Sequence, residues 1–341
     1  MTRRRDVLAA LPALSVASLA SAQGPRSVSP KRIGGLHLVD GPEKTDPAKP
    51  LEYERPFWEA LSKKGWILGD NIVIERVYAN WETERLSGLA ADLVRKRVDV
   101  ILCGGDEAEL VAAARATQTI PILFVGALIP VEQGLIDSFS RPGRNLTGTA
   151  LHAGTEVATK RLEFLRAIVQ GDRLSWLWGG DTRFAETLRG SQIDVAKMYE
   201  SAAAGLGFTT RLHLVPTPAA IDKVFDDIVA WKAQAITGGG YQIQNRAAEF
   251  ALRNGLPFAS NHRYLVEAGG LLSYGISRSE RATLDDAVVE YLDRVLRGAK
   301  PSELPVVQPS RYELVINMKT AKALGLTVPQ SILQRADDIL Q

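Results

Sequence analysis

The sequence predicts an α/β protein with two Rossmann-like lobes, each a parallel sheet with helices on both faces. Three observations predict this class. The chain has 341 residues, more than one typical domain. Short apolar segments alternate with amphipathic ones in both halves, which is the pattern of βα units. A turn-forming run at 141–145 (Arg-Pro-Gly-Arg-Asn) interrupts the alternation, which then starts again. We therefore expect two copies of one architecture joined near residue 150.

In the first half, strands are expected where apolar and β-branched residues lie between turn-forming residues. Helices are expected where apolar residues recur every three or four positions. The segment 51–64 shows this spacing, and Gly65 ends it. We expect the strand at 146–150 to cross between the lobes. The expected strands are 32–36, 71–77, 98–102, 121–125 and 146–150, and the expected helices are 51–64, 84–97 and 106–117.

The second half repeats the alternation. An amphipathic helix follows it and ends in 296–301 (Leu-Arg-Gly-Ala-Lys-Pro), and 312–326 is expected to form a lobe-crossing strand and a docking helix. The expected strands are 174–178, 210–215, 235–237 and 257–260, and the expected helices are 156–169, 186–205, 219–231 and 242–254.

The composition is that of a soluble globular protein, with 45% hydrophobic and 23% charged residues. A formal charge of +2 argues against nucleic-acid binding, which normally shows a basic excess on one face. Cys103 is the single cysteine, so neither an intramolecular disulfide nor a cysteine-based metal site is expected. It follows the apolar run 98–102, and we expect a buried, unreactive thiol.

The first 22 residues are expected to be a removable signal peptide. Arginines at 3–5 precede an apolar stretch at 7–19, and 20–22 (Ala-Ser-Ala) supplies the small residues that signal peptidase reads. The apolar stretch is too short to remain as a membrane span. The run 4–8 (Arg-Arg-Asp-Val-Leu) resembles a twin-arginine signal. The other interpretation of this terminus is a disordered basic tail.

Export would place the mature protein in the periplasm. Removal of residues 1–22 takes away three of the 41 Lys and Arg and one of the 39 Asp and Glu. The mature chain then has 38 side chains of each sign and no net charge.

The expected binding site lies between the lobes, because ligands of open α/β sheets bind at the carboxyl ends of the strands. Glycines there allow close backbone approach, and the helices that follow offer free N–H donors. The candidate ligand-binding residues are His37, Gly105, Asp106, Gly126, His152, Trp178, Gly179, Tyr241, Asn261 and Tyr274.

Several candidates also have an ordinary structural interpretation. Asp106 is either a helix N-cap or the partner of a ligand amine. The histidines at 37 and 152 either contact the ligand or are ordinary loop residues, and Trp178 either lines the crevice or packs in the core. Tyr241 and Tyr274 are the stronger aromatic candidates, because both follow glycine-rich or strand-end positions.

No pattern in the sequence indicates catalysis. The four histidines have neither an i, i+4 histidine partner nor a paired cysteine, as a metal site would require. The glycines at 238–240 lack the Gly-Lys-Ser/Thr of a phosphate loop. A Gly-x-Ser-x-Gly elbow for a nucleophilic serine is also missing. We therefore expect a protein that is not an enzyme and needs neither a metal nor a cofactor.

The part of the chain from Gly269 to Ala336 carries a recognisable series of motifs. It contains 269–275 (Gly-Gly-Leu-Leu-Ser-Tyr-Gly), 304–309 (Leu-Pro-Val-Val-Gln-Pro) and the run 312–329. In their amino-acid sequence and in their order along the chain, these motifs resemble those of ABC-transporter substrate-binding proteins of the tryptophan/tyrosine-receptor-like type. Motifs earlier in the chain follow the family's order at 57–71, 85–101, 117–122, 140–148 and 160–165.

The resemblance implies the type I periplasmic-binding-protein fold, in which a three-crossing hinge closes two lobes on a small ligand. It implies a first lobe of 31–150 plus about 273–308, and a second of 151–272 plus about 309–341. The implied partners are a small-molecule ligand and the membrane permease of an ABC transporter. We expect a monomer that does not bind nucleic acid.

Some relatives resemble aromatic amino-acid receptors, which implies a ligand carboxylate held at helix N-termini. Here Asp106 and Glu107 bring two acids where relatives carry a small or hydroxyl residue. The run 129–131 (Ile-Pro-Val) replaces the family's Asp-Pro-Val. The two acids would repel a ligand carboxylate at that helix tip. The resemblance thus predicts the fold and the role, but not the ligand.

The leading hypothesis is an exported solute-binding protein of an ABC importer. Its ligand would be small and polar or amphipathic, such as an amino acid or a related molecule. One alternative is a receptor that presents its ligand to a sensor kinase, and another is an exported enzyme, since α/β folds host many chemistries. A transcription regulator of the same fold is excluded by the signal peptide and the lack of an N-terminal helix-turn-helix.

Overall fold

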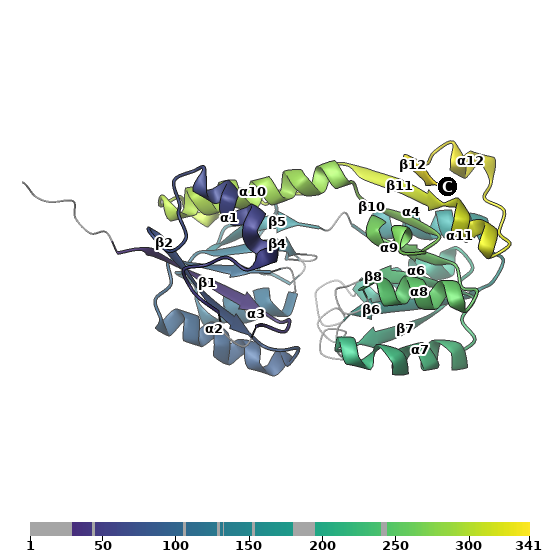
Figure 1. Cartoon of the computed structure of the whole chain (residues 1–341), viewed down its shortest axis with the longest axis horizontal. Coiled ribbons are helices and arrows are strands. Elements are labelled where there is room, and N and C mark those ends of the chain that lie inside the picture. Colours follow the sequence, from purple (N-terminus) through teal and green to yellow (C-terminus); the bar gives the residue numbers. More distant parts are fainter. Residues whose placement is uncertain are drawn as a thin grey trace, which may run out of the picture.

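The computed structural model describes residues 29–42, 45–104, 107–127, 130–131, 133–151, 154–179, 195–239 and 244–341. These residues form two lobes, each built on one β-sheet with helices on both faces (Figure 1). The predicted two-lobed α/β class is thus confirmed. The predicted signal peptide, and residues 186–194 of a predicted helix, lie outside the described residues.

The first lobe has a five-stranded parallel sheet in the order β2-β1-β3-β4-β5. One apolar core joins the sheet to α2 and α3, and another joins it to α1 and α10, so both faces are covered. Its strands are β1 (Lys31–His37), β2 (Ile72–Tyr78), β3 (Val100–Cys103), β4 (Ile122–Ala127) and β5 (Leu146–Ala150). Its helices are α1 (Arg55–Ser62), α2 (Leu86–Arg95), α3 (Glu107–Ala116) and α10 (Arg278–Leu296), with short 3-10 turns at Glu52–Glu54, Thr83–Arg85 and Pro301–Glu303.

The second lobe has a seven-stranded sheet in the order β12-β11-β10-β9-β8-β6-β7. Its strands are β6 (Arg173–Gly179), β7 (Thr209–Val215), β8 (Ala235–Gly239), β9 (Phe258–Ser260), β10 (Leu272–Ile276), β11 (Tyr312–Asn317) and β12 (Asp338–Leu340). Its helices are α4 (Gly154–Ile168), α6 (Val195–Gly205), α7 (Ile221–Ala230), α8 (Gln244–Arg253), α9 (Arg263–Glu267), α11 (Met318–Ala323) and α12 (Gln330–Leu333), with a 3-10 turn at Pro218–Ala220.

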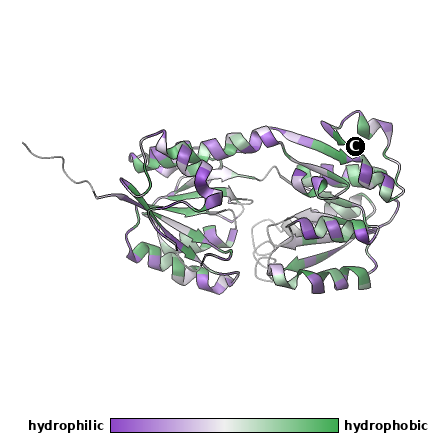
Figure 2. Ribbon diagram, viewed as in Figure 1, coloured by the Kyte–Doolittle hydropathy of each residue, from purple (hydrophilic) through white to green (hydrophobic). Residues whose placement is uncertain are grey.

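The second sheet differs from the prediction in one pairing. β10 and β11 run antiparallel, while the remaining described pairs are parallel. The antiparallel pair arises because the chain leaves this lobe after β10, forms α10 on the first lobe, and returns as β11. Figure 2 shows hydrophobic strands inside each lobe and helices with hydrophilic outer faces.

The two segments predicted to cross between the lobes are instead strands within a sheet. β5 pairs with β4 in the first sheet, and β11 pairs with β10 and β12 in the second. The crossings lie just outside these strands, after β5, between β10 and α10, and before β11. Sheet pairing satisfies the backbone N–H and C=O groups of both strands, which a bare crossing would leave to water.

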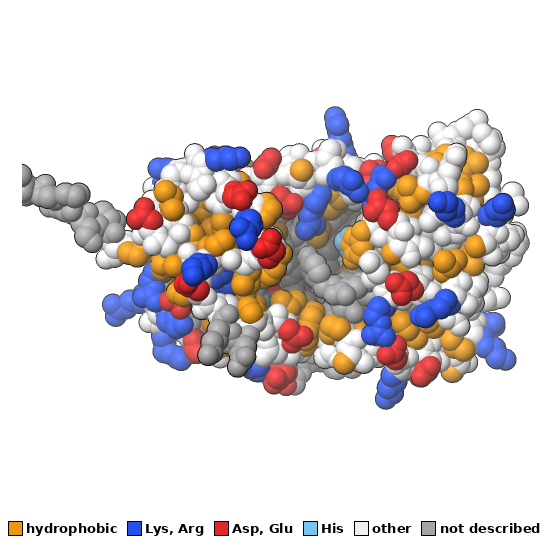
Figure 3. All heavy atoms as spheres, in the orientation of Figure 1, with side chains coloured by type: hydrophobic (Ala, Val, Ile, Leu, Met, Phe, Trp, Pro, Cys, Tyr) orange, Lys and Arg blue, Asp and Glu red, His pale blue; other side chains and the backbone are white. Residues whose placement is uncertain are grey.

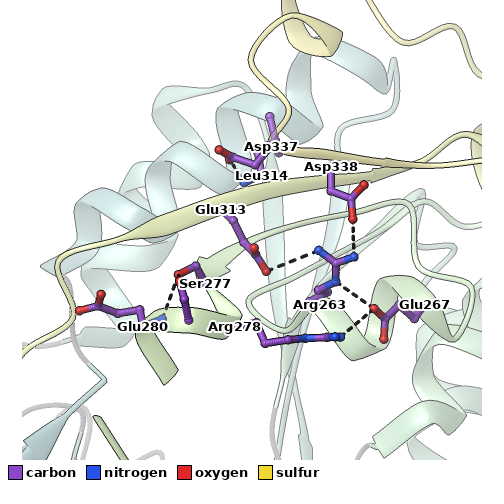
Figure 4. A network of polar contacts seen from close by, with 10 residues as sticks. Arg263, Glu267, Ser277, Arg278, Glu280, Glu313, Leu314, Asp337 and Asp338 are labelled. Atoms are coloured by element: carbon purple, nitrogen blue, oxygen red, sulfur yellow. Dashed lines mark hydrogen bonds and ion pairs between the residues drawn. The ribbon is translucent and has the colours of Figure 1, made fainter. Parts of the chain in front are cut away.

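Two polar networks fasten the crossings. Glu280, in the first turn of α10, accepts hydrogen bonds from the backbone N–H (2.7 Å) and the hydroxyl (3.2 Å) of Ser310. It thereby ties the start of the second crossing to the third. The other network centres on Arg263 of α9, which pairs with Glu267 (2.9 Å), with Asp338 of β12, and with Glu313 of β11 at 4.0 Å (Figure 4).

Candidate functional site

A hollow separates the two lobes and is visible in the space-filling view (Figure 3). Parallel strands such as β1 and β7 run toward the space between the lobes (Figure 1). The carboxyl ends of the strands, and the loops that follow them, therefore line a crevice. This is the edge at which α/β sheets bind ligands, because backbone N–H groups and helix N-termini gather there.

His37 ends β1 at this edge and lies nearly parallel to Tyr78, with ring centroids 5.0 Å apart. Its Nε2 atom is buried and has no hydrogen-bond partner. Burial is the main cause that lowers the pKa of His37 to about 4; the charge of Glu54 opposes the shift and that of Arg76 adds to it. At neutral pH, His37 is thus a neutral imidazole with one unused polar atom.

Glu109 of α3 is a buried carboxylate that the sequence analysis missed. It accepts a hydrogen bond from the backbone N–H of Leu38 (2.5 Å) and another from that of Gly104 (2.6 Å). Leu38 follows β1 and Gly104 follows β3, so one carboxylate fixes two neighbouring loops of the crevice. The only signal in the sequence is an acid in the first turn of a helix, which is a common position for acids.

Gly126 marks a β-bulge near the end of β4. The register with β5 shifts between Val125 and Ala127, and Gly126 has φ +80°. A Cβ at this position would lie 2.9 Å from the Leu151 side chain. The bulge bends the strand where it meets the crevice. Backbone geometry therefore explains the glycine, and its contact with a ligand stays a prediction.

Asn261 and His262 follow β9 at the corresponding edge of the second lobe. The Oδ1 atom of Asn261 is buried without a hydrogen-bond partner. It lies so close to Gly239, the last residue of β8, that a Cβ there would be 2.3 Å away. Burial, together with the charges of Arg281 and Arg161, lowers the pKa of His262 to about 4. This loop therefore carries an unused acceptor beside a neutral imidazole.

Trp178 and Gly179 end β6, and the half-buried Trp178 ring meets Trp176 edge-on at 6.3 Å. Tyr274, in β10, packs its ring against Phe164 (5.4 Å) and Tyr312 (6.2 Å). The Tyr274 ring thus belongs partly to the core of the second lobe. A contact between either aromatic residue and the ligand stays a prediction.

The structure brings His37 and Gly126 to one wall of the crevice, and Trp178, Gly179 and Asn261 to the other. Four further candidates lie outside the described residues, and their contacts stay predictions: Gly105, Asp106, His152 and Tyr241.

Metal-binding clusters and exposed thiols are not found among the described residues. The described ranges contain no group of three or more His, Cys, Asp or Glu that could hold a metal ion. Cys103 is buried, and burial raises the pKa of its thiol.

No helix within the described ranges is both long and apolar enough to span a membrane. A cavity of about 470 Å³ lies away from the crevice, between the end of α3 and the start of β5.

Comparisons with known proteins agree with this architecture. The model of a family described as ABC transporter substrate binding protein matches residues 50–172 and 219–340. A tyrosine-binding protein of Clostridioides difficile (strain R20291) is 26% identical over 299 residues, which is 87% of this chain and 81% of the relative.

Two solved structures have the same fold. An ABC domain in complex with L-Trp from Streptococcus pneumonia has a TM-score of 0.71 at 22% identity, with 92% of this chain and 100% of that chain covered. A conserved domain protein from Vibrio cholerae has a TM-score of 0.71 at 22% identity, with 91% and 99% covered.

Proposed function

Because this chain belongs to the ABC transporter substrate-binding protein family, we propose that it is the solute receptor of an ABC importer. It binds a small molecule in the crevice between its lobes and delivers that molecule to a membrane permease. Closure of the lobes is driven by contacts that the ligand makes only in the closed state. The protein itself carries out no reaction.

One observation carries this proposal: a residue at a strand end on each side of the crevice has a buried polar atom without a partner among the described residues. Nε2 of His37 belongs to the first lobe and Oδ1 of Asn261 to the second. A buried polar group without a hydrogen bond is unfavourable by about 1–3 kcal/mol. A ligand clamped between the lobes would supply partners to both at once, which favours the closed state.

The proposed ligand is an amino acid or a related polar or amphipathic molecule. The proposal is supported by the relative described as a tyrosine-binding protein and by the L-Trp complex of the same fold. The signal-peptide pattern at residues 1–22 supports a periplasmic location for the mature protein, and we propose that it acts there as a monomer.

Native mass spectrometry of the protein from Gln23 onward tests the function. We expect a mass above that of the chain alone, and release of a small organic molecule on denaturation. Protein that carries no ligand would next be tested by thermal shift against the twenty L-amino acids, and at least one should raise the Tm. A bound nucleotide or metal ion, or the turnover of a bound compound, would contradict the receptor function.

A further inference from the structure

Two arginines are deeply buried in the described part of the chain, and only one of them has a counter-charge. Arg76, 8% exposed, donates to both carboxylate oxygens of Glu54 and to the backbone carbonyls of Asp46 and Lys49. Arg161 of α4 is 3% exposed, and its Nη1 makes one long bond of 3.4 Å to the Tyr274 carbonyl. Its Nε has no partner.

Among the described residues, no carboxylate forms an ion pair with Arg161, and the one hydrogen-bond acceptor found for it there is the Tyr274 carbonyl. Removing a guanidinium from water is strongly unfavourable unless an anion and hydrogen bonds replace the solvent. The Glu54–Arg76 pair shows how this fold satisfies a buried arginine when the partner is internal. Among the described residues around Arg161, no carboxylate takes the role that Glu54 has beside Arg76.

The position of Arg161 relates it to the crevice. Its hydrogen-bond partner, Tyr274, lies in β10 one residue before Gly275, and a Cβ at Gly275 would be 1.9 Å from the carbonyl oxygen of Asn261. Arg161 and Asn261 therefore lie against adjacent residues of β10, Tyr274 and Gly275. The charges of Arg281 and Arg161 both act on His262, the next residue. Arg161 thus lies at the carboxyl edge of β9 and β10.

Two complementary features meet at this edge. Arg161 offers an unused N–H and a positive charge that no carboxylate of the described residues pairs with, and Asn261 offers a buried oxygen that accepts no hydrogen bond there. A ligand group that satisfies both would be an anion with an N–H or O–H donor nearby. Guanidinium groups pair well with planar carboxylates through parallel hydrogen bonds. One buried cation also matches the single charge of a carboxylate better than the double charge of a phosphate.

The first lobe carries buried negative charge at its side of the crevice, in contrast to the positive charge of Arg161. Glu107 and Glu109 are both buried in the first turn of α3. Negative charge at this helix tip disfavours a ligand carboxylate there, as the sequence had indicated. The polarity of the crevice therefore favours an orientation in which the acidic end of the ligand faces the second lobe.

We propose that Arg161 is the anion-binding residue of the second lobe, and that the solute carries a carboxylate with an adjacent N–H or O–H donor that bonds to Asn261. The inference rests on the proposed receptor function and specifies its ligand class. In the ligand-free protein the described residues give Arg161 no counter-charge, and in the complex it is one half of an ion pair.

Isothermal titration calorimetry with defined probes tests this assignment. The twenty L-amino acids, benzoate and inorganic phosphate are titrated into the wild-type protein. The acid that binds most tightly is then compared with its amide, in which an uncharged carbamoyl group replaces the carboxylate, and with the analogue that lacks the carboxyl group. We expect both analogues, which lack the carboxylate, to bind at least about tenfold more weakly, because each loses a charged hydrogen bond.

The same acid is titrated into Arg161→Gln, Arg161→Lys and Arg253→Gln. Arg253 is an exposed arginine near the end of α8 and serves as the charge-matched control. We expect Arg161→Gln to bind about tenfold or more weakly, Arg161→Lys to bind with intermediate affinity, and the control to bind as the wild type does.

Thermal unfolding without ligand separates a ligand role from a structural one. If Arg161 awaits an external anion, Arg161→Gln has an unchanged or higher Tm without ligand but loses the stabilisation by the acid. A clearly lower Tm in ligand-free Arg161→Gln would mean that the arginine holds the fold together, and would overturn the inference.

The remaining outcomes also separate the two proposals. Equal binding of the acid and its amide would overturn the anion site while leaving the receptor function intact. The same holds if phosphate binds and the carboxylates do not. A wild-type protein that neither binds any probe nor carries a co-purified solute would contradict both proposals.

Discussion

At the scale of single residues, two histidines couple the crevice to pH. His37 and His262 lie on opposite walls, and burial lowers the pKa of each from 6.5 to about 4. Above pH 6.5 both imidazoles are neutral in the folded and the unfolded chain. Between pH 6.5 and 4 only the unfolded chain takes up these protons. The free energy of unfolding therefore falls as the pH decreases through this window.

Urea unfolding at pH 7.5 and pH 4.5 measures this effect in the wild type, His37→Gln and His262→Gln. We expect the loss of unfolding free energy between the two pH values to be smaller in each variant by about 2 kcal/mol. Carboxylates that titrate in the same range contribute equally to all three proteins and cancel in the comparison. An unchanged loss in a variant would mean that the replaced histidine titrates normally in the folded protein.

Glu109 yields a second prediction at this scale. Glu109→Ala removes the acceptor of two backbone N–H groups, those of Leu38 and Gly104. We expect this change to lower the free energy of unfolding by roughly 3 kcal/mol, since two donors lose their partner. Glu249→Ala, at an exposed position of α8, should change it by about 0.5 kcal/mol or less. Equal effects of the two changes in urea unfolding would show that Glu109 does not fix the loops.

At the scale of the elements, alternating apolar and amphipathic segments were enough to predict most strands and helices of both sheets. β5 lies where it was predicted, at residues 146–150. α9, α12 and β12 were not predicted, and they have only five, four and three residues. So few positions do not establish a period of 3.6 or 2.0 residues, and tertiary packing decides their conformation.

The site was predicted less completely than the fold, for a physical reason. The rule that ligands bind at the carboxyl edge predicted a crevice between the lobes, and His37 and Asn261 lie at strand ends beside it, where their contact with a ligand stays a prediction. Glu109 and Arg161 were not among the predicted site residues, because each lies on a helix, where a charged side chain is usually exposed to solvent. Their importance lies in their burial and in the partners they have or lack, which depend on strands distant in the sequence.

Close packing between β10 and the loop after β9 gives a prediction at the element scale. A Cβ at Gly275 would lie 1.9 Å from the carbonyl oxygen of Asn261, so Gly275→Ala must displace that backbone. We expect a loss of unfolding free energy of about 2 kcal/mol or more, together with weaker ligand binding, because Asn261 moves.

Gly88→Ala provides the matched control, because Gly88 lies in α2 with open space around its Cβ position. Alanine there should stabilise the protein by about 0.5–1 kcal/mol. If urea unfolding showed that both substitutions stabilise the protein, the loop would have to be more compliant than the structure indicates.

At the scale of the whole molecule, the relative position of the lobes depends on the residues that join the crossings. The Arg263 network holds β11, β12 and α9 together within the second lobe, and Arg278, the first residue of α10, extends it through Glu267 at 3.3 Å (Figure 4). Most members of this network are partly exposed, so salt screens their attraction. Glu280 differs, because it is buried and holds Ser310 through two hydrogen bonds.

Glu280 therefore provides a test of the hinge that leaves the crevice untouched. Glu280→Ala leaves the N–H of Ser310 without its acceptor and removes one tie between the second crossing and the third, beside the hydrogen bond from the Ser277 N–H to the Arg311 carbonyl (3.2 Å). We expect the free energy of unfolding to fall by about 2 kcal/mol. A looser hinge also gives the open state more conformational freedom, so closure on the ligand becomes less favourable and affinity falls about threefold or more. Small-angle scattering of the ligand-free variant should give a larger radius of gyration than that of the wild type.

Glu290→Ala is the control on the same helix. Glu290 pairs with Lys64 inside the first lobe and takes no part in a crossing, so both affinity and radius of gyration should stay at the wild-type values. If Glu280→Ala behaved like this control, the lobes would have to be positioned by the antiparallel β10–β11 pair and the adjoining hydrogen bond from Ser277 to Arg311. The hinge would then be a property of the second sheet, because β10 leads into α10 and β11 receives the returning chain.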